Sequence, residues 1–444
     1  MTATTHASQR SPLHGGWYAV AVLILIYTLS YIDRTILTLL VKPIRASLNI
    51  SDTGVSLLGG FAFAIFYTLL GIPVGRLADR GNRVRLIAAG VALWSVMTGL
   101  AGLSRSFWQL FIARIGVGVG EAALGPSAYS MLSDYFKGAM LTRVLSLYSA
   151  SVYIGVGLAA IIGGALIASV PALDLPMLGH LQPWQSVFLC VGFPGLLFAL
   201  LMLSVREPAR TGLARGTAAG QSIPLRDVAQ FMWERRGAYG FLIAGLSASA
   251  LLWNGVSYWM PTFFSRTFGW DAPLVGLRFG LMVLICGTLG ITTGGLLGAW
   301  LRSRGHADAN VRLCMLAALL AWPLGVLAPQ IDSQNLCVAV FSLFVFVAAM
   351  PWGCAAAAFQ EITPNQMRGQ VTAVYFLFLN MAGIGLGSTV VALITDRVFH
   401  DDMAVRHSLS LVAAIAAPLA VILLWCARKP YVRCRESMAE IVMS

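Results

Sequence analysis

Long apolar segments separated by short polar ones run through almost the whole chain. Twelve of them reach the roughly 20 residues that an α-helix needs to cross a lipid bilayer. They lie at approximately 17–40, 54–78, 84–104, 107–133, 143–169, 184–205, 237–263, 273–301, 311–329, 335–360, 369–396 and 406–427. The pattern therefore predicts an all-α membrane protein with twelve transmembrane helices.

One long polar connection, rich in Arg, divides these segments into two sets of six. The predicted organisation is a cytoplasmic tail at 1–16, a six-helix bundle at 17–205, a linker at 206–236, a second six-helix bundle at 237–427 and a basic cytoplasmic tail at 428–444. Within the linker, residues 225–236 have the pattern of a short amphipathic helix that lies on the membrane surface.

The two sets look like weak repeats of each other. Matching positions are Asp134 with Glu361, and Gly155 and Gly157 with Gly383 and Gly385. Parallel repeats of this kind surround a central cavity in transporters that work by alternating access. The alternative interpretation is that the glycine pairs only allow helices to pack closely.

Composition agrees with a multi-pass membrane protein. Of the 444 residues, 58% are hydrophobic and only 11% are charged, whereas soluble proteins carry about 25% charged residues. The net charge is +12, and the basic residues gather on alternate loops and on both tails, which places both termini in the cytoplasm. This distribution argues against a nucleic-acid partner. The seven Cys are scattered without the spacing of a disulfide framework or a metal site, so neither metal nor cofactor is expected.

Two full charges, Arg114 and Glu121, lie inside the fourth apolar segment. Each costs roughly 2.5–3.5 kcal/mol at the centre of a bilayer. They lie on one stripe of the helix, about 10 Å apart along its axis, so this stripe is expected to face a partner or a watery cavity. Asp33 in the first segment lies at nearly the same depth as Arg114. We expect Asp33 to pair with Arg114, which also attracts Glu121, while Arg34 contacts a neighbour or the substrate.

The loop after the second segment reads GRLADRGNRVRL and begins at Gly75. It resembles the signature loop G-x-L-A-D-R-x-G-R of the major facilitator superfamily, with Asn82 where that pattern has Gly. The resemblance implies a two-bundle transporter fold. It also implies a gating role for Gly75, Asp79, Arg80 and Arg83.

Two further motifs resemble the spinster branch of that superfamily. The run from Arg114 to Glu121 fits R-x-x-x-G-x-G and continues as Gly-Glu-Ala, and the run from Tyr31 to Arg34 fits Tyr-x-Asp-Arg. The resemblance implies that Asp33 and Glu121 respond to protons, with Arg114 as their partner. A buried carboxylate that loses a guanidinium partner favours its protonated form. The alternative is a static buried ion pair that only fixes helix packing.

The second half offers candidates for the opposite wall of a substrate cavity, with ordinary helix packing as the alternative. They are Trp253, Asn254, Trp352 and Asn380. Animal members of the spinster branch imply an amphipathic, lysolipid or sphingoid-like substrate. A small organic acid or a drug-like compound is the alternative.

These observations predict a proton-coupled secondary transporter. We expect a monomer in a bacterial cytoplasmic (inner) membrane that works among membrane lipids, with protons and a small amphipathic molecule as its partners. A membrane sensor without transport is less favoured, because no loop or tail is long enough for a signalling domain. An enzyme is not expected, because the sequence offers no nucleophile–base pair or cofactor loop.

Overall fold

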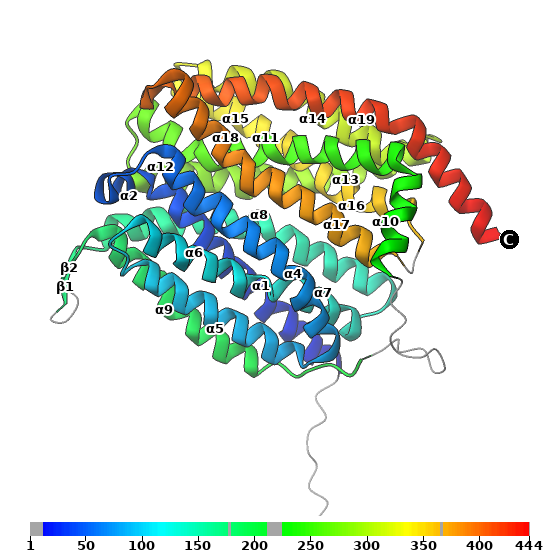
Figure 1. Cartoon of the computed structure of the whole chain (residues 1–444), viewed down its shortest axis with the longest axis horizontal. Helices are drawn as coiled ribbons and strands as arrows, with labels where there is room; N and C mark the ends of the chain where they lie inside the picture. The colour runs from blue at the N-terminus through cyan, green and yellow to red at the C-terminus, as the bar shows by residue number, and fades with distance from the viewer. Residues whose placement is uncertain (1–11, 176–178, 211–223, 365–366, 444) are drawn as a thin grey trace, which may run out of the picture.

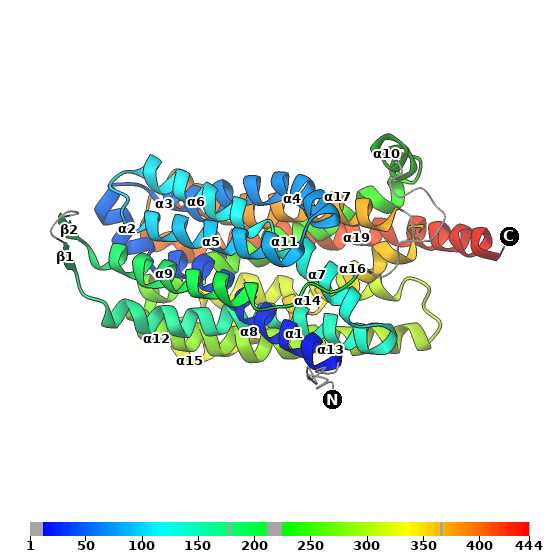
Figure 2. The same ribbon diagram turned by 90° about the horizontal axis from the view of Figure 1, so that it is seen from below.

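A computed structural model shows the chain as an elongated bundle of helices that run along its long axis (Figure 1, Figure 2). The structure describes residues 12–175, 179–210, 224–364 and 367–443. Pro12 at the start of α1 and Met443 at the end of α19 lie toward one end of the bundle, which we call the terminal end. The opposite end, which we call the hairpin end, carries the two short antiparallel strands β1 (Leu173–Leu175) and β2 (Gly179–Leu181).

The first six spans come before the linker and use nine helical elements. They are α1 (Pro12–Leu39); α3 (Asp52–Ser56), the π-helical η1 (Leu57–Phe61) and α4 (Ala62–Arg80); α5 (Arg83–Ala101); α6 (Phe107–Glu121) and α7 (Leu124–Tyr135); α8 (Gly138–Ser169); and α9 (Pro183–Leu203). The short helix α2 (Val41–Leu48) joins the first two spans at the hairpin end.

The second six spans follow α10 (Leu225–Glu234), a short helix at the terminal end. They are α11 (Arg236–Phe268); α12 (Ala272–Met282), η2 (Val283–Gly287) and α13 (Thr288–Ser303); α14 (Ala309–Leu327) and η3 (Ala328–Gln330); α15 (Gln334–Ala349) and α16 (Pro351–Glu361); α17 (Arg368–Asn380), η4 (Met381–Gly387), α18 (Ser388–Leu393) and η5 (Ile394–Phe399); and η6 (Asp402–Ala404) with α19 (Val405–Met443).

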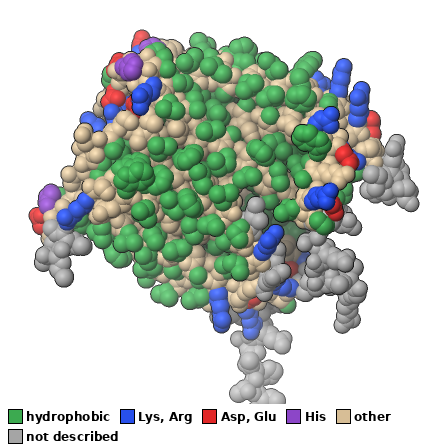
Figure 3. All heavy atoms as spheres, in the orientation of Figure 1, with side chains coloured by type: hydrophobic (Ala, Val, Ile, Leu, Met, Phe, Trp, Pro, Cys, Tyr) green, Lys and Arg blue, Asp and Glu red, His purple; other side chains and the backbone are tan. Residues whose placement is uncertain are grey.

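Twelve helical stretches among the described residues are long and apolar enough to cross a membrane. Their bounds agree closely with the apolar segments of the sequence, so the predicted all-α, twelve-span fold class is confirmed. Figure 3 shows the same property on one face of the molecule, where hydrophobic side chains cover the middle and charged ones gather toward the two ends. The chain is a multi-pass membrane protein.

The two sets of six spans form two halves, blue to teal and green to red in Figure 1. One buried apolar cluster, around Trp94 and Met131, belongs to the first half, and another, around Tyr239 and Phe359, belongs to the second. The largest cluster contains side chains from both halves, including Ile36 and Phe264. The halves therefore share an apolar core in addition to their own.

Glycines bring α8 and α12 of opposite halves into close contact. A Cβ atom on Gly157 would lie 2.7 Å from the carbonyl oxygen of Gly280, and one on Gly276 would lie 2.3 Å from the carbonyl oxygen of Ala160. Small residues allow this approach of two backbones within a membrane. Helix α8 packs extensively on α12 but makes few contacts with α13, which continues the same span toward the terminal end. The two halves thus meet along this pair in the half of the bundle nearer the hairpin.

The residues after the last apolar segment continue α19 as far as Met443. This extension packs against the terminal end of the second half, where the Arg428 guanidinium donates to Asp308. Burial raises the pKa of Asp308, but the hydrogen bond from Arg428 and the charges of Arg428 and Arg312 outweigh it and leave the pKa below its usual value. This pairing therefore stays ionised at neutral pH.

The close contact of α8 and α12 predicts that Gly276→Ala lowers stability. The added methyl group overlaps the Ala160 carbonyl, and overpacking of this kind costs about 1–3 kcal/mol. Thermal unfolding of the purified protein in detergent measures the effect. Gly295→Ala in the same span is the matched control, because a Cβ atom there meets nothing within 4 Å. Equal unfolding midpoints for the two variants would contradict the proposed packing.

Candidate functional site

The fourth span is interrupted directly after Glu121. Helix α6 ends at this residue, and α7 begins three residues later at Leu124. Pro126, in the first turn of α7, lacks an N–H group, and its ring disfavours a helical position for the carbonyl of Ala122. The break places the Glu121 carboxylate at a helix end in the interior of the bundle, where it is only 1% exposed.

The glycines of the motif that precedes Glu121 fix the position of α6 between its neighbours. A Cβ atom on Gly118 would lie 2.8 Å from the carbonyl oxygen of Phe63 in α4, and one on Gly120 would lie 2.7 Å from that of Gly90 in α5. Any side chain at these positions would push a neighbouring backbone away. The motif thus has a packing role that brings Glu121 close to three other helices.

Glu121 is held by two side chains of α1. Ser30 donates a 2.5 Å hydrogen bond to Glu121 Oε2, and Arg34 Nε donates to the same oxygen at 2.8 Å. A second nitrogen of Arg34 completes an ion pair with this oxygen. Ser30 and Arg34 are four residues apart, so they share one face of α1. The first and fourth spans are therefore joined through one carboxylate oxygen.

Arg114 is buried without a hydrogen-bond partner for any of its three guanidinium nitrogens among the described residues. The negative charges of Asp33 and Glu121 act on it through space, yet neither forms an ion pair with it in the described part of the chain. The expected direct pairing of Asp33 with Arg114 is therefore not formed among the described residues, whereas Arg34 contacts a neighbouring helix as expected. Arg34 lies on the face of α1 that meets the end of α6, so Arg34 rather than Arg114 binds Glu121.

Aromatic rings surround both guanidinium groups. The Arg34 guanidinium carbon lies 4.4 Å from the ring centroid of Phe63 and 5.1 Å from that of Tyr67, while the carbon of Arg114 lies 5.9 Å from Phe63. Such cation–π contacts stabilise a guanidinium that has left water. The sequence analysis missed these rings. The spacing of Phe63 and Tyr67, one helical turn apart on a span that faces the first, was the signal that could have found them.

More tyrosines extend from this cluster toward the terminal end. Tyr27, one turn before Tyr31 on α1, stacks on Tyr148 of α8 with 4.9 Å between ring centroids. Tyr129 of α7 meets Tyr148 edge-on and shares a hydrogen bond with Ser149. Tyr129 is 44% exposed, while Arg114, which lies nearer the hairpin end on the same span, is 1% exposed. The first half therefore has a group of contacting tyrosines between its buried charges and the terminal end.

The second-half candidates lie apart from the charged cluster. Trp253 packs edge-on against Tyr153 of the first half at 6.0 Å, and the Asn254 amide donates to the Ala250 carbonyl of its own helix. Trp352 packs against the apolar cores, and Asn380 is half-buried. No contact among the described residues joins these four to Arg34 or Glu121, so their substrate role stays a prediction.

The predicted gating loop lies at the terminal end of the first half. A Cβ atom on Gly75 would meet only Pro126, at 3.9 Å, and the side chains of Asp79 and Arg80 lie outside the described residues. Arg83 is fully buried. Its Nε donates to Glu207 at 2.7 Å, and its Nη1 donates to Asp134 at 2.5 Å.

Arg83 therefore ties the start of α5 to the end of α7 and to the segment after α9. The sequence analysis missed Glu207, which also accepts a 3.0 Å hydrogen bond from the backbone N–H of Val84.

The second half repeats this arrangement with different chemistry. In the repeat, Asn310 takes the position of Arg83 and Glu361 that of Asp134, with the same offset in sequence. The Asn310 amide donates to Glu361 at 3.0 Å. Arg302 and Tyr431 also bind this carboxylate. The repeat inferred from Asp134 and Glu361 thus has a counterpart in side-chain contacts.

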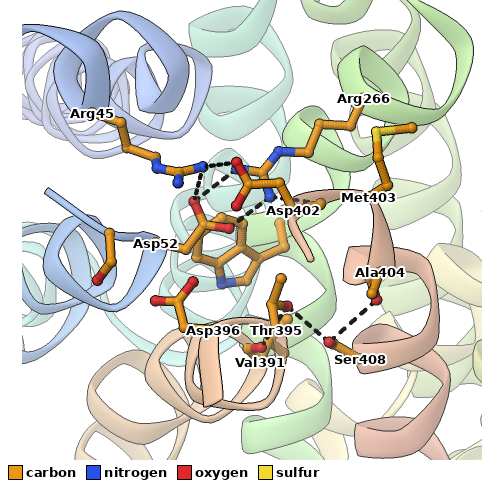
Figure 4. Close-up of polar contacts among 12 residues, drawn as sticks. Arg45, Asp52, Arg266, Val391, Thr395, Asp396, Asp402, Met403, Ala404 and Ser408 are labelled. Atoms are coloured by element: carbon orange, nitrogen blue, oxygen red, sulfur yellow. Dashed lines mark hydrogen bonds and ion pairs between the residues drawn. The ribbon is translucent and has the colours of Figure 1, made fainter. Parts of the chain in front are cut away.

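A second charged network joins the halves at the hairpin end (Figure 4). Arg266 of α11 donates to both oxygens of Asp52 at 2.6 and 2.7 Å. Arg45 of α2 contacts Asp52 at 3.0 Å and Asp402 at 2.6 Å. Asp52 is completely buried. The network therefore connects α2 and α3 of the first half to the end of α11 and to η6 of the second half, and the sequence analysis did not find it.

One oxygen from each of Asp52, Asp396 and Asp402 lies within 4.8 Å of the others. Such a group can hold a cation. The guanidinium groups of Arg45 and Arg266 already neutralise two members, and Asp396 accepts hydrogen bonds from the backbone N–H and hydroxyl of Thr53. Ion pairing between the halves accounts for this geometry.

Comparison with known proteins identifies the family. A sequence model of the Major Facilitator Superfamily matches residues 23–388. The chain belongs to this superfamily. An MFS-type efflux pump of Mycolicibacterium smegmatis is 29% identical, over 97% of this chain and 96% of that protein. Protein spinster homolog 1 of Rattus norvegicus is 27% identical, over 90% of this chain and 78% of that protein.

Among solved structures, a bacterial homologue of the human lysosomal transporter spinster, inward-facing and unoccupied, shares the fold of this chain. It has a TM-score of 0.74 and 24% identity, and the match covers 96% of this chain and 98% of that one. The superfamily match and the spinster relatives together define a spinster-type transporter, as the three sequence motifs predicted. Like the superfamily, it acts on small molecules.

The buried position of Arg83 in this transporter predicts that Arg83→Gln is strongly destabilising. The variant leaves Asp134 and Glu207 without their cation, and breaking a buried ion pair costs roughly 3–5 kcal/mol. The yield of folded protein and its thermal unfolding midpoint check this. Arg85→Gln, in the same first turn of α5 but exposed, is the control and should change the midpoint little. A stable Arg83→Gln protein would show that the contacts are dispensable.

Proposed function

We propose that this spinster-type transporter couples the movement of an amphipathic, lysolipid or sphingoid-like molecule to protons by alternating access. The observation that carries the proposal is the incomplete pairing of the buried charges. Glu121 is held by Ser30 and Arg34, while Arg114 on the same helix has no hydrogen-bond partner among the described residues. A guanidinium without a hydrogen-bond partner can bind an anion, and the neighbouring carboxylates can bind a proton.

The proton step follows from the contacts of Glu121. A proton that binds the Glu121 carboxylate removes its charge, and the ion pair with Arg34 then loses its electrostatic attraction. Arg34 becomes free to bind an anionic group of the substrate. When the proton leaves, Arg34 returns to Glu121 and the anionic group is released. Asp33 has a buried oxygen without a hydrogen-bond partner among the described residues, interacts electrostatically with Arg114 and is the second proposed proton-responsive carboxylate.

The substrate class follows from the same cluster. Arg34 and Arg114 offer two guanidinium groups to an anionic head group, with Phe63, Tyr67 and Tyr31 as aromatic walls. Trp253, Asn254, Trp352 and Asn380 are the proposed lining for the apolar part of the molecule in the second half. Two cationic groups also suit a small organic acid, so small organic acids and drug-like compounds remain the second candidate substrates.

Alternating access requires a contact between the halves that opens at one end at a time. The hairpin-end network and the close α8–α12 contact support a state closed at the hairpin end. Basic residues dominate the terminal end, which supports a cytoplasmic position for that end and for both termini. We therefore propose a monomer in a bacterial inner membrane, closed to the outside, with Gly75, Asp79, Arg80 and Arg83 in the cytoplasmic gate.

Replacement of Glu121 by Gln tests proton coupling. The variant keeps a hydrogen-bond acceptor for Arg34 but cannot gain or lose a proton. In proteoliposomes, uptake of a fluorescent lysophosphatidylglycerol should fall to the rate measured without a pH gradient, while exchange of labelled for unlabelled lipid continues. Glu234→Gln on α10, whose side chain is 56% exposed, is the control. Gradient-driven uptake that survives in Glu121→Gln would refute the coupling role.

Replacement of Asp52 by Asn tests the closed hairpin end. The variant leaves Arg266 and Arg45 without their buried carboxylate, a loss of roughly 3–5 kcal/mol, and should shift the population toward a state open at that end. Spin labels at Ala46 and Met403, in a background without the seven native Cys, should report a longer distance. Asp174→Asn, an exposed carboxylate at the same end, should leave the distance distribution unchanged. An unchanged distribution in Asp52→Asn would exclude this network as the contact that holds the end closed.

A further inference from the structure

A groove lies between the eighth and tenth spans, on α12–η2 and α15. The proposed transport mechanism makes no use of it. It encloses 370 Å³. Arg278, Leu281 and Ile285 form one wall, three and four residues apart, so they make one stripe of their helix. Asn335, Val338 and Ser342 form the other wall with the same spacing. We call it the α12–α15 groove.

The α12–α15 groove opens to the outside of the bundle. Gly276 and Gly280 face α8 across the contact between the halves. Arg278 is two residues from each, about 200° around the helix, so it points away from that contact. Leu281 and Ile285 are 40% and 52% exposed within a membrane-crossing segment. Lipid is therefore the medium that meets this surface.

Arg278 brings an uncompensated charge to this surface. It makes no ion pair in the described part of the chain, and its guanidinium carbon lies 4.5 Å above the ring of Trp270. Its helix begins at Ala272 at the hairpin end, so the Cα atom of Arg278 lies about 9 Å from that end along the helix. The side chain extends back toward the hairpin end. Arg side chains within membranes extend in this way to reach the head-group level.

Trp270 lies next to the groove on the side of the hairpin end, where its ring contacts Arg278. Its indole N–H donates to Gln334 at the start of α15 with a distance of 3.2 Å, which joins the two walls. Trp residues favour the head-group level of a bilayer. At the hairpin end, the groove is polar and carries the cation of Arg278 beside Asn335. Toward the middle of the bundle, its lining is apolar and comes from Leu281, Ile285 and Val338.

We propose that the α12–α15 groove binds an anionic phospholipid of the leaflet at the hairpin end. The phosphate is held by Arg278 and Asn335, and one acyl chain lies between Ile285 and Val338. The cation, the apolar stripes and the lipid-facing position each fit such a molecule. A second copy of the chain fits less well, because a twofold contact through this groove would bring Arg278 against its own counterpart.

Native mass spectrometry of the full-length protein in detergent tests the proposal. Phosphatidylglycerol, phosphatidylcholine and inorganic phosphate are titrated separately. We expect phosphatidylglycerol to bind most tightly and inorganic phosphate not to compete with it. Arg278→Gln should weaken phosphatidylglycerol binding about fivefold, the effect of about one basic residue at an anionic lipid. Ile285→Trp, which fills the apolar part and keeps the charge, should weaken both phospholipids.

Arg304→Gln is the matched control. Arg304 also lies over a Trp ring, at 4.8 Å from Trp300, but outside the groove, so its loss should leave this binding unchanged. Unchanged phosphatidylglycerol binding in both groove variants would overturn the proposal. Competition by inorganic phosphate would reduce the site to a simple anion site, and crosslinking of two chains across Val338 would identify the surface as a contact between copies. Either result also overturns it.

Discussion

The structure depends on how guanidinium and carboxylate groups are buried in an apolar bundle. Charged groups occur at three levels along the helices: Arg83 with Asp134 and Glu207 at the terminal end, the Glu121 cluster in the middle, and the Asp52 network at the hairpin end. In the two outer levels each of these carboxylates is paired with a guanidinium. In the middle level, Arg114 has no hydrogen-bond partner among the described residues. Because an unpaired buried charge is costly, this level is the one at which we propose that a proton or an anion acts.

The apolar packing and the charges act together. Gly118 and Gly120 bring α4, α5 and α6 so close that no side chain fits between them, and this closeness fixes the depth of Arg114 and Glu121. Between the halves, glycines bring α8 and α12 into close contact near the hairpin end, the same end that holds the Asp52 network. Close packing within the first half and an ion-paired contact between the halves suit a transporter whose halves move as rigid bodies.

The two halves divide the chemistry unequally. Their terminal ends carry matching contacts, Arg83 with Asp134 and Asn310 with Glu361, which agrees with an origin as repeats. Among the described residues, the fully buried charges between the two ends lie in the first half, whereas Trp259 and Phe341 of the second half lie in the apolar core. Repetition thus provides the frame, and the departure from repetition provides the candidate site. The proposed lipid site on α12 and α15 lies on the second half, away from the Glu121 cluster.

The sequence by itself determined the twelve spans, the division into two halves and the residues at mid-depth that need explanation, because the cost of a polar group in lipid is a property of each segment alone. It also determined the family, through Arg114 to Glu121, Tyr31 to Arg34 and the loop at Gly75. Only the tertiary structure decided which charges meet. Arg34 rather than Arg114 binds Glu121, and Asp52 finds Arg266 from a distant span, because the rotation and spacing of packed helices set those distances, and no local pattern along one helix contains them.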